Sequence, residues 1–231
     1  MKDAFKYAFP LTIPIMAGYI FLGISFGILA TSKDLPTYYP VIMAIFIYGG
    51  SMQFAAVNLL LAVFNPLGAV MLTIMVHARH IFYGITMLKP FNQLKKGPRK
   101  FYTMFGLTDE TFSLLASLDL PEEQDANWVY FLITLLNQSY WVIGCALGTL
   151  IGSRLTFNTQ GIEFVLTALF VTIFIDQWLS ATKHRPALIG LFGSAVCLMI
   201  FGGSNFMIPA MLVILVLFSL DFYQEVKTSN D

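Results

Sequence analysis

Hydrophobic residues along this chain fall into long uninterrupted runs that are separated by short polar stretches. About 20 apolar residues in a helix cross the hydrocarbon core of a bilayer, and several runs reach that length. The runs do not alternate apolar and polar residues, which argues against a membrane β-barrel. The pattern therefore predicts an all-α, polytopic membrane bundle of about seven spans, at Tyr7–Ala30, Tyr38–Phe64, Leu67–Leu88, Trp128–Gly152, Glu163–Ala181, Pro186–Phe201 and Phe206–Phe222.

The longest polar stretch lies between the third and fourth predicted spans and contains one further apolar segment, Phe101–Leu118. This segment has Asp109 and Glu110 at its middle, which is unfavourable for a helix that crosses lipid. We expect a re-entrant or interfacial helix here rather than a span. Thr108 is placed to cap its N-terminus, where the helix dipole favours the two carboxylates in the first turn.

Composition agrees with a membrane protein and excludes several other classes. The chain is 57% hydrophobic and only 11% charged, whereas soluble domains carry about 25% charged residues. Its formal net charge of +0 gives no electrostatic reason to bind nucleic acid. Cys145 and Cys197 both fall in apolar segments, so we interpret them as packing residues rather than disulfide or metal ligands. One transmembrane domain, residues 1–231, is expected.

The distribution of basic residues predicts an orientation, because cytoplasmic loops are enriched in lysine and arginine. Seven spans with the N-terminus outside give a split of 9 to 3 between cytoplasm and exterior. If Phe101–Leu118 were an eighth span, the best split would be 7 to 5. This comparison favours seven spans, with Lys95 and Lys183 in the cytoplasm and Arg154 outside.

A weak internal repeat relates the first and fourth predicted spans. Tyr19, Gly23 and Gly27 match Tyr140, Gly144 and Gly148 at one offset, and a further match joins Gln53 to Gln177. Small residues four apart are common in packed membrane helices, so coincidence is a competing explanation. A genuine repeat of halves 7–88 and 128–201 would have inverted topology, as in many secondary transporters.

The second predicted span contains an unusual group of polar and small residues between Tyr48 and Asn58. Gly49, Gly50, Ser51 and Gln53 lie deep in an apolar run, where polar groups need partners or line a cavity. One interpretation is a glycine-mediated helix contact, with Gln53 in an interhelical hydrogen bond. The other is a broken helix that lines a substrate site near the middle of the bilayer.

Two further polar groups lie in predicted spans. Arg79 is flanked by His77 and His80, which share a helix face and suit a proton relay better than a zinc site, since no third ligand is near in sequence. Arg79 either binds within the protein or snorkels toward the cytoplasmic face. Asp176 and Gln177 form the other pair, and Asp176 is either the partner of Arg79 or a proton site. Asn137 and Gln138 suit interhelical hydrogen bonds or a cavity wall.

Four motifs together resemble the AzlC family, the large subunits of branched-chain amino-acid exporters. They are Gly49-Gly50-Ser51-Met52-Gln53-Phe54-Ala55-Ala56, Arg79-His80, Thr108-Asp109-Glu110-Thr111-Phe112 and Trp141-x-x-Gly144-x-x-x-Gly148. The resemblance covers most of the chain and implies a bacterial inner-membrane exporter of leucine, isoleucine, valine or methionine. It also implies a small membrane partner of the AzlD type.

These observations lead to the hypothesis of a secondary-active exporter driven by the proton motive force. No nucleotide-binding loop or hydrolase signature occurs in the sequence, and no cofactor or metal is expected. The alternatives are a non-transporting membrane subunit and an intramembrane enzyme. The expected substrate-binding residues are Gly49, Gly50, Ser51, Gln53, Asn58, Arg79, Asp176 and Gln177, and the proton-coupling candidates are His77, His80, Asp109, Glu110 and Asp176.

Overall fold

The computed structural model describes residues 1–63, 65–77, 79–154, 164, 167–168, 171, 174–175, 178–179, 184–203, 206, 209–210 and 212–220. The chain divides into two compact units, Met1–Thr167 and Ala168–Asp231. Helices are the only regular secondary structure in these ranges, so the predicted all-α class is confirmed. Two helices in the described ranges are long and apolar enough to cross a membrane alone, and one bent pair would make a third span.

The first unit is built around two long helices, α1 (Lys2–Ser32) and α8 (Ala126–Gly152). Shorter helices fill the chain between them, each much shorter than a span. They are α2 (Tyr39–Phe46), α3 (Gly50–Leu61), α4 (Pro66–His77), α5 (Arg79–Gln93), α6 (Pro98–Phe105) and α7 (Asp109–Ala116).

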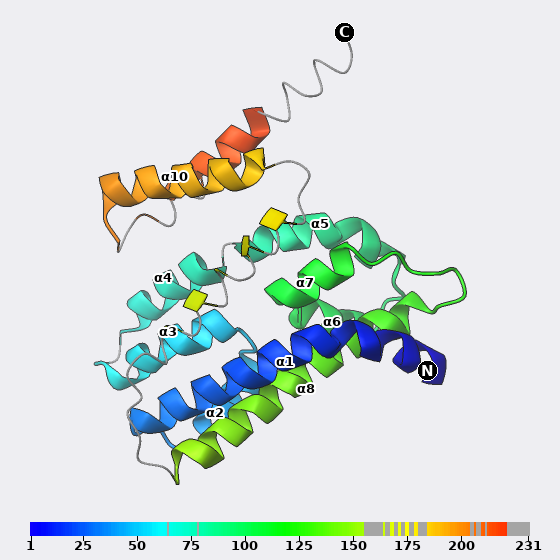
Figure 1. The fold of residues 1–231 in the computed structure, drawn as a ribbon, viewed down its shortest axis with the longest axis horizontal. Helices are drawn as coiled ribbons and strands as arrows, with labels where there is room; N and C mark the ends of the chain where they lie inside the picture. Colours follow the sequence, from blue (N-terminus) through cyan, green and yellow to red (C-terminus); the bar gives the residue numbers. More distant parts are fainter. Residues whose placement is uncertain are drawn as a thin grey trace. The chain divides into compact units, whose positions relative to one another are not determined.

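Glycines bring the backbones of α1 and α8 into direct contact. A Cβ atom added to Gly23 would lie 2.9 Å from the Cys145 nitrogen, and one on Gly144 would lie 2.8 Å from the Ile20 carbonyl oxygen. One turn further along, Gly148 meets the backbone of α1 in the same way. Because these contacts advance in the same direction along both helices, α1 and α8 are parallel, as Figure 1 shows.

This parallel arrangement corrects the predicted inverted repeat. Gly23 and Gly27 do meet Gly144 and Gly148, but helices related by inverted topology run in opposite directions across the membrane. The matched residues of segments one and four therefore make a packing interface rather than a sign of two inverted halves. Helix α8 runs in the same direction as α1 because of the path of the chain between them.

The second predicted span folds back on itself instead of crossing. The carbonyl oxygen of Ile45 near the end of α2 accepts a hydrogen bond from Gln138 Nε2 (2.9 Å), at the middle of α8. The helix is interrupted at 47–49. Near the start of α3, Gln53 accepts a hydrogen bond from Trp141, which also lies at the middle of α8. Figure 1 shows α3 returning toward the C-terminal end of α1. We call α2 and α3 the first hairpin.

Helices α6 and α7 form a second hairpin that enters from the opposite end. The Arg99 guanidinium lies 3.7 Å from the centre of the Trp128 ring, near the start of α8. The chain turns at Gly106, and after α7 the carbonyl oxygen of Asp119 accepts a hydrogen bond from Tyr7 (3.3 Å), near the start of α1. Both open ends of this hairpin therefore lie beside the N-terminal ends of α1 and α8.

The second hairpin corrects the prediction of one helix over Phe101–Leu118. The structure has two helices of 8 residues each, separated by Gly106, Leu107 and Thr108. Each is about 12 Å long, less than half of the roughly 30 Å hydrocarbon core. The predicted cap is confirmed, because the Thr108 side chain accepts a hydrogen bond from the Thr111 backbone (3.3 Å).

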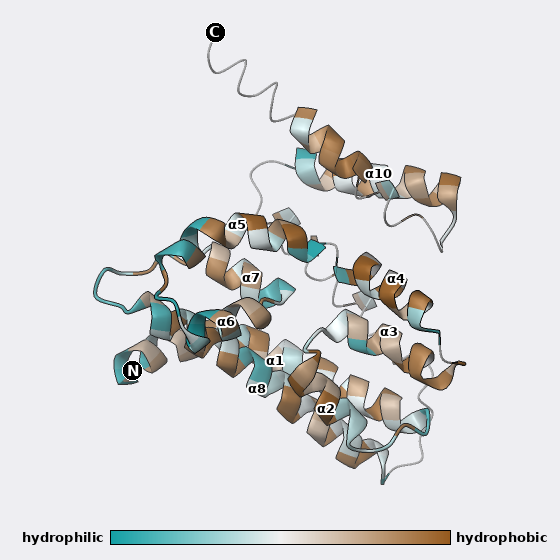
Figure 2. Ribbon diagram, turned by 180° about the vertical axis from the view of Figure 1, so that it is seen from behind, coloured by the Kyte–Doolittle hydropathy of each residue, from teal (hydrophilic) through white to brown (hydrophobic). Residues whose placement is uncertain are grey.

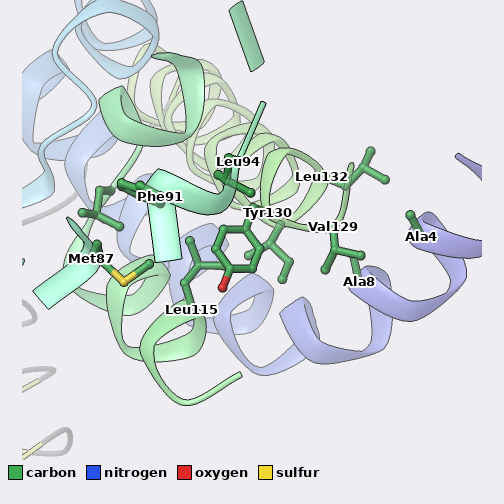
Figure 3. Close-up of a cluster of buried hydrophobic side chains, with 11 residues drawn as sticks. Ala4, Ala8, Met87, Phe91, Leu94, Leu115, Val129, Tyr130 and Leu132 are labelled. Atoms are coloured by element: carbon green, nitrogen blue, oxygen red, sulfur yellow. The ribbon is translucent and has the colours of Figure 1, made fainter. Parts of the chain in front are cut away.

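Helices α4 and α5 together run from one end of the unit to the other, opposite to α1 and α8. The pair bends by 48°. A buried hydrophobic cluster fixes the far end of α5 to α1, α7 and α8, and Figure 3 shows most of it. Its members are Ala4, Ala8, Met87, Phe91, Leu94, Leu107, Leu115, Val129, Tyr130, Leu132 and Ile133.

The second unit contains α10 (Arg185–Phe201), which agrees with the predicted span Pro186–Phe201. Residues 209–210 and 212–220 are also helical, and a Cβ atom on Gly193 of α10 would lie 3.2 Å from the Ile214 side chain. Cys197 is buried here, and Cys145 is buried in the first unit; both are free thiols, as predicted for packing residues. Asp176, Gln177 and Lys183 lie outside the described residues.

The glycine contacts predict a large difference between two chemically identical substitutions. Gly148→Ala should destabilise the protein by about 1–3 kcal/mol, because the new methyl group would overlap the backbone at Ile24. Gly18→Ala is the matched control, since no atom lies within 4 Å of its added Cβ, and alanine is the better helix former. Thermal unfolding in detergent would compare them. Equal stability of both variants would contradict the close packing.

The fold also revises the predicted orientation. Lys2 and Lys6 share one end of the first unit with the basic residues between Lys89 and Lys100, because the Lys95 backbone donates to Asn127 Oδ1 (2.7 Å) at the start of α8. Seven basic residues lie at this end, and Lys33 and Arg154 at the other. The positive-inside rule then favours a cytoplasmic N-terminus, opposite to the sequence-based prediction. Lys95 stays inside and Arg154 outside.

Single cysteines test this orientation in a background where Cys145 and Cys197 are replaced by alanine. An impermeant thiol reagent should label Arg154→Cys in intact cells, whereas Lys6→Cys and Lys95→Cys should react only after the membrane is opened. The two protected positions report separately on the N-terminus and on the loop after α5. Labelling of Lys6→Cys in intact cells, with Lys95→Cys protected, would restore an external N-terminus.

Candidate functional site

The tips of the two hairpins meet at the middle of α8. A Cβ atom added to Gly106 would lie 3.5 Å from the Tyr48 ring, and the rings of Tyr48 and Phe105 are 6.5 Å apart. The junction of α4 and α5 reaches the same place, because an added Cβ on Gly49 would lie 3.0 Å from His77 Cε1. Three breaks in the helical backbone therefore converge, and Figure 2 shows hydrophilic residues where α4 ends and where α5 and α7 begin.

Converging breaks bring helix ends of both polarities together. Helices α3, α5 and α7 begin there, and α2, α4 and α6 end there. Helix starts present unpaired N–H groups and partial positive charge, and helix ends present unpaired carbonyls and partial negative charge. Tyr48 has a φ of 44°, a conformation that is costly for a residue with a side chain and that is often found at functional sites.

Gln53 supplies a polar group at the tip of the first hairpin. It is 0% exposed, and its Oε1 accepts a hydrogen bond from Trp141 Nε1 (2.8 Å). Its Nε2 has no hydrogen-bond partner among the described residues. Gly50 lets the chain approach the Trp141 ring, with an added Cβ 3.2 Å from Cη2. The predicted interhelical hydrogen bond is thus present, but it involves only the oxygen of the Gln53 amide and not its nitrogen.

A hydrogen-bonded network surrounds the second tip. The Tyr19 hydroxyl donates to Glu110 Oε2 (2.6 Å) and lies 2.6 Å from Thr108 Oγ1. Asn137 Nδ2 donates to Thr111 Oγ1 (3.0 Å). Asn137 is 0% exposed, and within the described part of the chain its Oδ1 has no partner. Among the described residues, Gln53 Nε2, Asn137 Oδ1, the Tyr48 hydroxyl and His80 Nδ1 are therefore buried without a hydrogen-bond partner around the converging breaks.

Arg79 at the start of α5 joins the two hairpins. Its Nη2 donates to Ser51 Oγ on α3 (2.8 Å) and forms an ion pair with Asp109 Oδ2 on α7 (2.9 Å). The Tyr83 hydroxyl donates to the other carboxylate oxygen of Asp109 (2.7 Å). Arg79 is thus held at the breaks and does not snorkel toward Lys89. Asp109, predicted as a proton-coupling candidate, is thus an ion-pair partner of Arg79. Asp176, the partner that the sequence suggested, lies outside the described residues.

The two adjacent carboxylates have different surroundings. Asp109 has the Arg79 guanidinium, whereas none of the described cations lies within ion-pair distance of Glu110. Burial raises the pKa of the Glu110 carboxyl above its usual range, and the hydrogen bond from Tyr19 opposes that rise. Asp109 adds a smaller upward effect on the Glu110 pKa through like charge, because the two carboxylates would both be negative.

The two histidines lie at the junction of α4 and α5, on different helices rather than on one face of a single helix as predicted. The rings of His77 and His80 are 4.8 Å apart, and the His80 ring is 5.2 Å from that of Tyr83. The structure thus brings most predicted site residues to one region: Gly49, Gly50, Ser51, Gln53, His77, Arg79, His80, Asp109 and Glu110. For Asn58 only the backbone, in α3, is described, and Asp176 and Gln177 are outside the described residues.

Comparison with known proteins gives a clear relationship. The family model described as "AzlC protein" matches residues 14–155. The chain is 50% identical to "Branched-chain amino acid transport protein AzlC" of Bacillus subtilis over 92% of this chain and 83% of that protein. The chain belongs to the AzlC family.

Two further relatives are less similar to this chain. The chain is 40% identical to an "Uncharacterized membrane protein" of Haemophilus influenzae, over 92% of this chain and 86% of that protein. It is 27% identical to "Inner membrane protein YgaZ" of Escherichia coli, over 77% and 73% of the two chains. No solved structure gives a significant match. The region matched by the AzlC model includes both hairpins and α8.

A repeated motif at the two tips escaped the sequence analysis. Tyr48-Gly49-x-Ser51-x-Gln53 and Phe105-Gly106-x-Thr108-x-Glu110 match at a constant offset of 57 residues, since 105 minus 48 equals 110 minus 53. Each has an aromatic residue, a glycine, a hydroxyl, and then an amide or acid. Because the hairpins enter from opposite ends, this is the inverted repeat of the AzlC region. An alignment of whole predicted spans does not reveal this match, because it is confined to six residues in each hairpin.

Proposed function

We propose that this protein is the large subunit of a secondary exporter of branched-chain or other apolar amino acids in a bacterial inner membrane. Membership of the AzlC family and the printed function of the Bacillus subtilis relative support a role in amino-acid transport. The observation that carries the proposal is the convergence of three helix breaks on buried, unsatisfied polar groups, which is how secondary transporters bind small polar substrates.

The site suits a zwitterion because it offers both kinds of partner. The start of α3 and Gln53 Nε2 provide donors for the substrate carboxylate. Asn137 Oδ1 and the carbonyls that end α2 provide acceptors for the ammonium group. The backbone groups that face the substrate in this proposal belong to Gly49, Gly50 and Ser51. Aromatic rings of Tyr48 and Trp141 lie beside it and suit an apolar side chain.

Arg79 has a different role in this proposal from the one that the sequence suggested. Its charge is compensated by Asp109, so it holds the two tips together and leaves the substrate carboxylate to uncharged donors. Asn58, Asp176 and Gln177 remain candidate substrate-binding residues from the sequence. The absence of a nucleotide-binding motif in the sequence favours the proton motive force as the source of energy.

Export can be measured as leucine retained by cells after they are loaded with a leucine dipeptide. Cells with this chain and its small partner should retain less leucine than cells without them. Gln53→Ala should reduce export about tenfold or more, because it removes a buried substrate donor worth about 1.5 kcal/mol or more. Gln93→Ala, an exposed residue at the end of α5, is the matched control and should export normally.

The same assay separates the competing functions. Unchanged leucine retention by the wild-type protein, with unchanged resistance to toxic leucine analogues, would contradict amino-acid export and favour a non-transporting membrane subunit. Normal export by Gln53→Ala at wild-type abundance would show that the substrate does not bind at the tip of the first hairpin. Loss of abundance in both glutamine variants would indicate a folding effect, which membrane immunoblots would detect.

A second prediction concerns the small partner of the AzlD type, which the family resemblance implies. The two proteins should co-purify in mild detergent, and export should require both. Gln53→Ala should still co-purify, because Gln53 is buried within this chain. Gly148 is unsuitable as a probe of this association, since it packs against α1 of the same chain. Full export by this chain alone, in a host without any AzlD homologue, would contradict the prediction.

A further inference from the structure

We propose that Glu110 carries the coupling proton of this transporter, while Asp109 beside it is an ion-pair partner of Arg79. The inference rests on the proposed transport function and assigns one group among five sequence candidates. It follows from three independent features: the inverted relation of the hairpins, the different surroundings of the two carboxylates, and the position of Glu110 at a helix start.

The inverted repeat places Gln53 and Glu110 at equivalent positions of the two tips. Each side chain accepts a hydrogen bond from an aromatic residue of a long helix, Gln53 from Trp141 (2.8 Å) and Glu110 from Tyr19 (2.6 Å). The rings of Tyr19 and Trp141 are themselves in edge-to-face contact, 5.6 Å apart. An amide does not titrate in the physiological range and a carboxyl group does. The two tips therefore differ in one respect that matters for coupling: only the second can bind a proton at this position.

The surroundings of the two carboxylates assign the proton to Glu110 rather than Asp109. Asp109 is paired with Arg79 (2.9 Å) and accepts a hydrogen bond from Tyr83 (2.7 Å), so both of its oxygens already have partners. Glu110 has one described hydrogen-bond donor from another helix, the neutral Tyr19 hydroxyl. The titratable or charged groups that face Glu110 are Tyr19, Tyr48, Arg79, Tyr83 and Asp109.

Protonation of Glu110 would change how the second hairpin is held. Ionised Glu110 lies in the first turn of α7, where the helix dipole favours negative charge. Protonation removes that charge and gives the carboxyl an O–H donor, which can bind an acceptor that the ionised form repels. One proton bound from the outside and released to the cytoplasm per cycle would drive the amino acid outward. Burial raises the pKa of the Glu110 carboxyl above its usual range, which favours proton binding.

The test uses everted membrane vesicles from cells that express the full chain with its small partner. Radiolabelled leucine uptake is measured with an imposed pH gradient, acid inside, and counterflow is measured in leucine-loaded vesicles without a gradient. In Glu110→Gln the accumulation ratio should fall to about one, since a gradient acts only through a group whose protonation differs between states. Counterflow should persist, because exchange of leucine across the membrane without a gradient requires no net movement of protons. Glu123→Gln, in the exposed loop before α8, should accumulate leucine as the wild type does.

A second variant keeps the proposal testable if Glu110→Gln is poorly made. Tyr19→Phe removes the hydroxyl that stabilises ionised Glu110, so the pH at which gradient-driven uptake is half-maximal should move upward. Gradient-driven accumulation by Glu110→Gln, or an unchanged pH profile in Tyr19→Phe, would overturn the inference. Loss of counterflow as well as accumulation in Glu110→Gln at normal abundance would also overturn it, because Glu110 would then be needed for substrate binding. Absence of both activities in the wild type would instead refute the proposed function.

Discussion

A helix that stops inside an apolar environment leaves its terminal N–H and C=O groups without water, and this constraint governs the first unit. Such ends are tolerated only where protein surrounds them. Here six helix ends meet at one place, at the middle of α8. Arg79 binds the first hairpin at Ser51 and the second at Asp109 (2.8 and 2.9 Å). A single charged side chain therefore connects the tips of both hairpins.

The sequence allowed the class, the family and most of the central residues to be predicted, because these depend on local signals. Long apolar runs indicate membrane helices, and a polar group within such a run must have a partner. Thr108 was predicted as a helix cap and has that role. The partner of Arg79 was not predicted, since Asp109 is 30 positions away in a segment that hydropathy assigned to an interface. Pairing across folded-back segments is tertiary information that a one-dimensional hydropathy pattern does not contain.

Segment two shows why hydropathy failed to distinguish a span from a hairpin. Its 27 residues are as apolar as a crossing helix, and the feature that folds it back is only the pair Tyr48-Gly49 followed by a helix start at Gly50. One extra crossing reverses every later helix, so counting this segment as a span also changes the orientation that the basic residues favour for the N-terminus. Because α1 and α8 are parallel, their N-terminal ends lie together, and most basic residues of the first unit are at that end.

The glycine contact between α1 and α8 also limits how the protein can move. Where backbones touch without intervening side chains, there is no layer of rotatable groups along which the helices can slide. These two helices therefore form one rigid frame. Any change that opens the centre first to one side of the membrane and then to the other has to take place in the half-length segments that rest against this frame. The short non-helical links at 47–49 and 106–108 interrupt these segments at the centre of the unit.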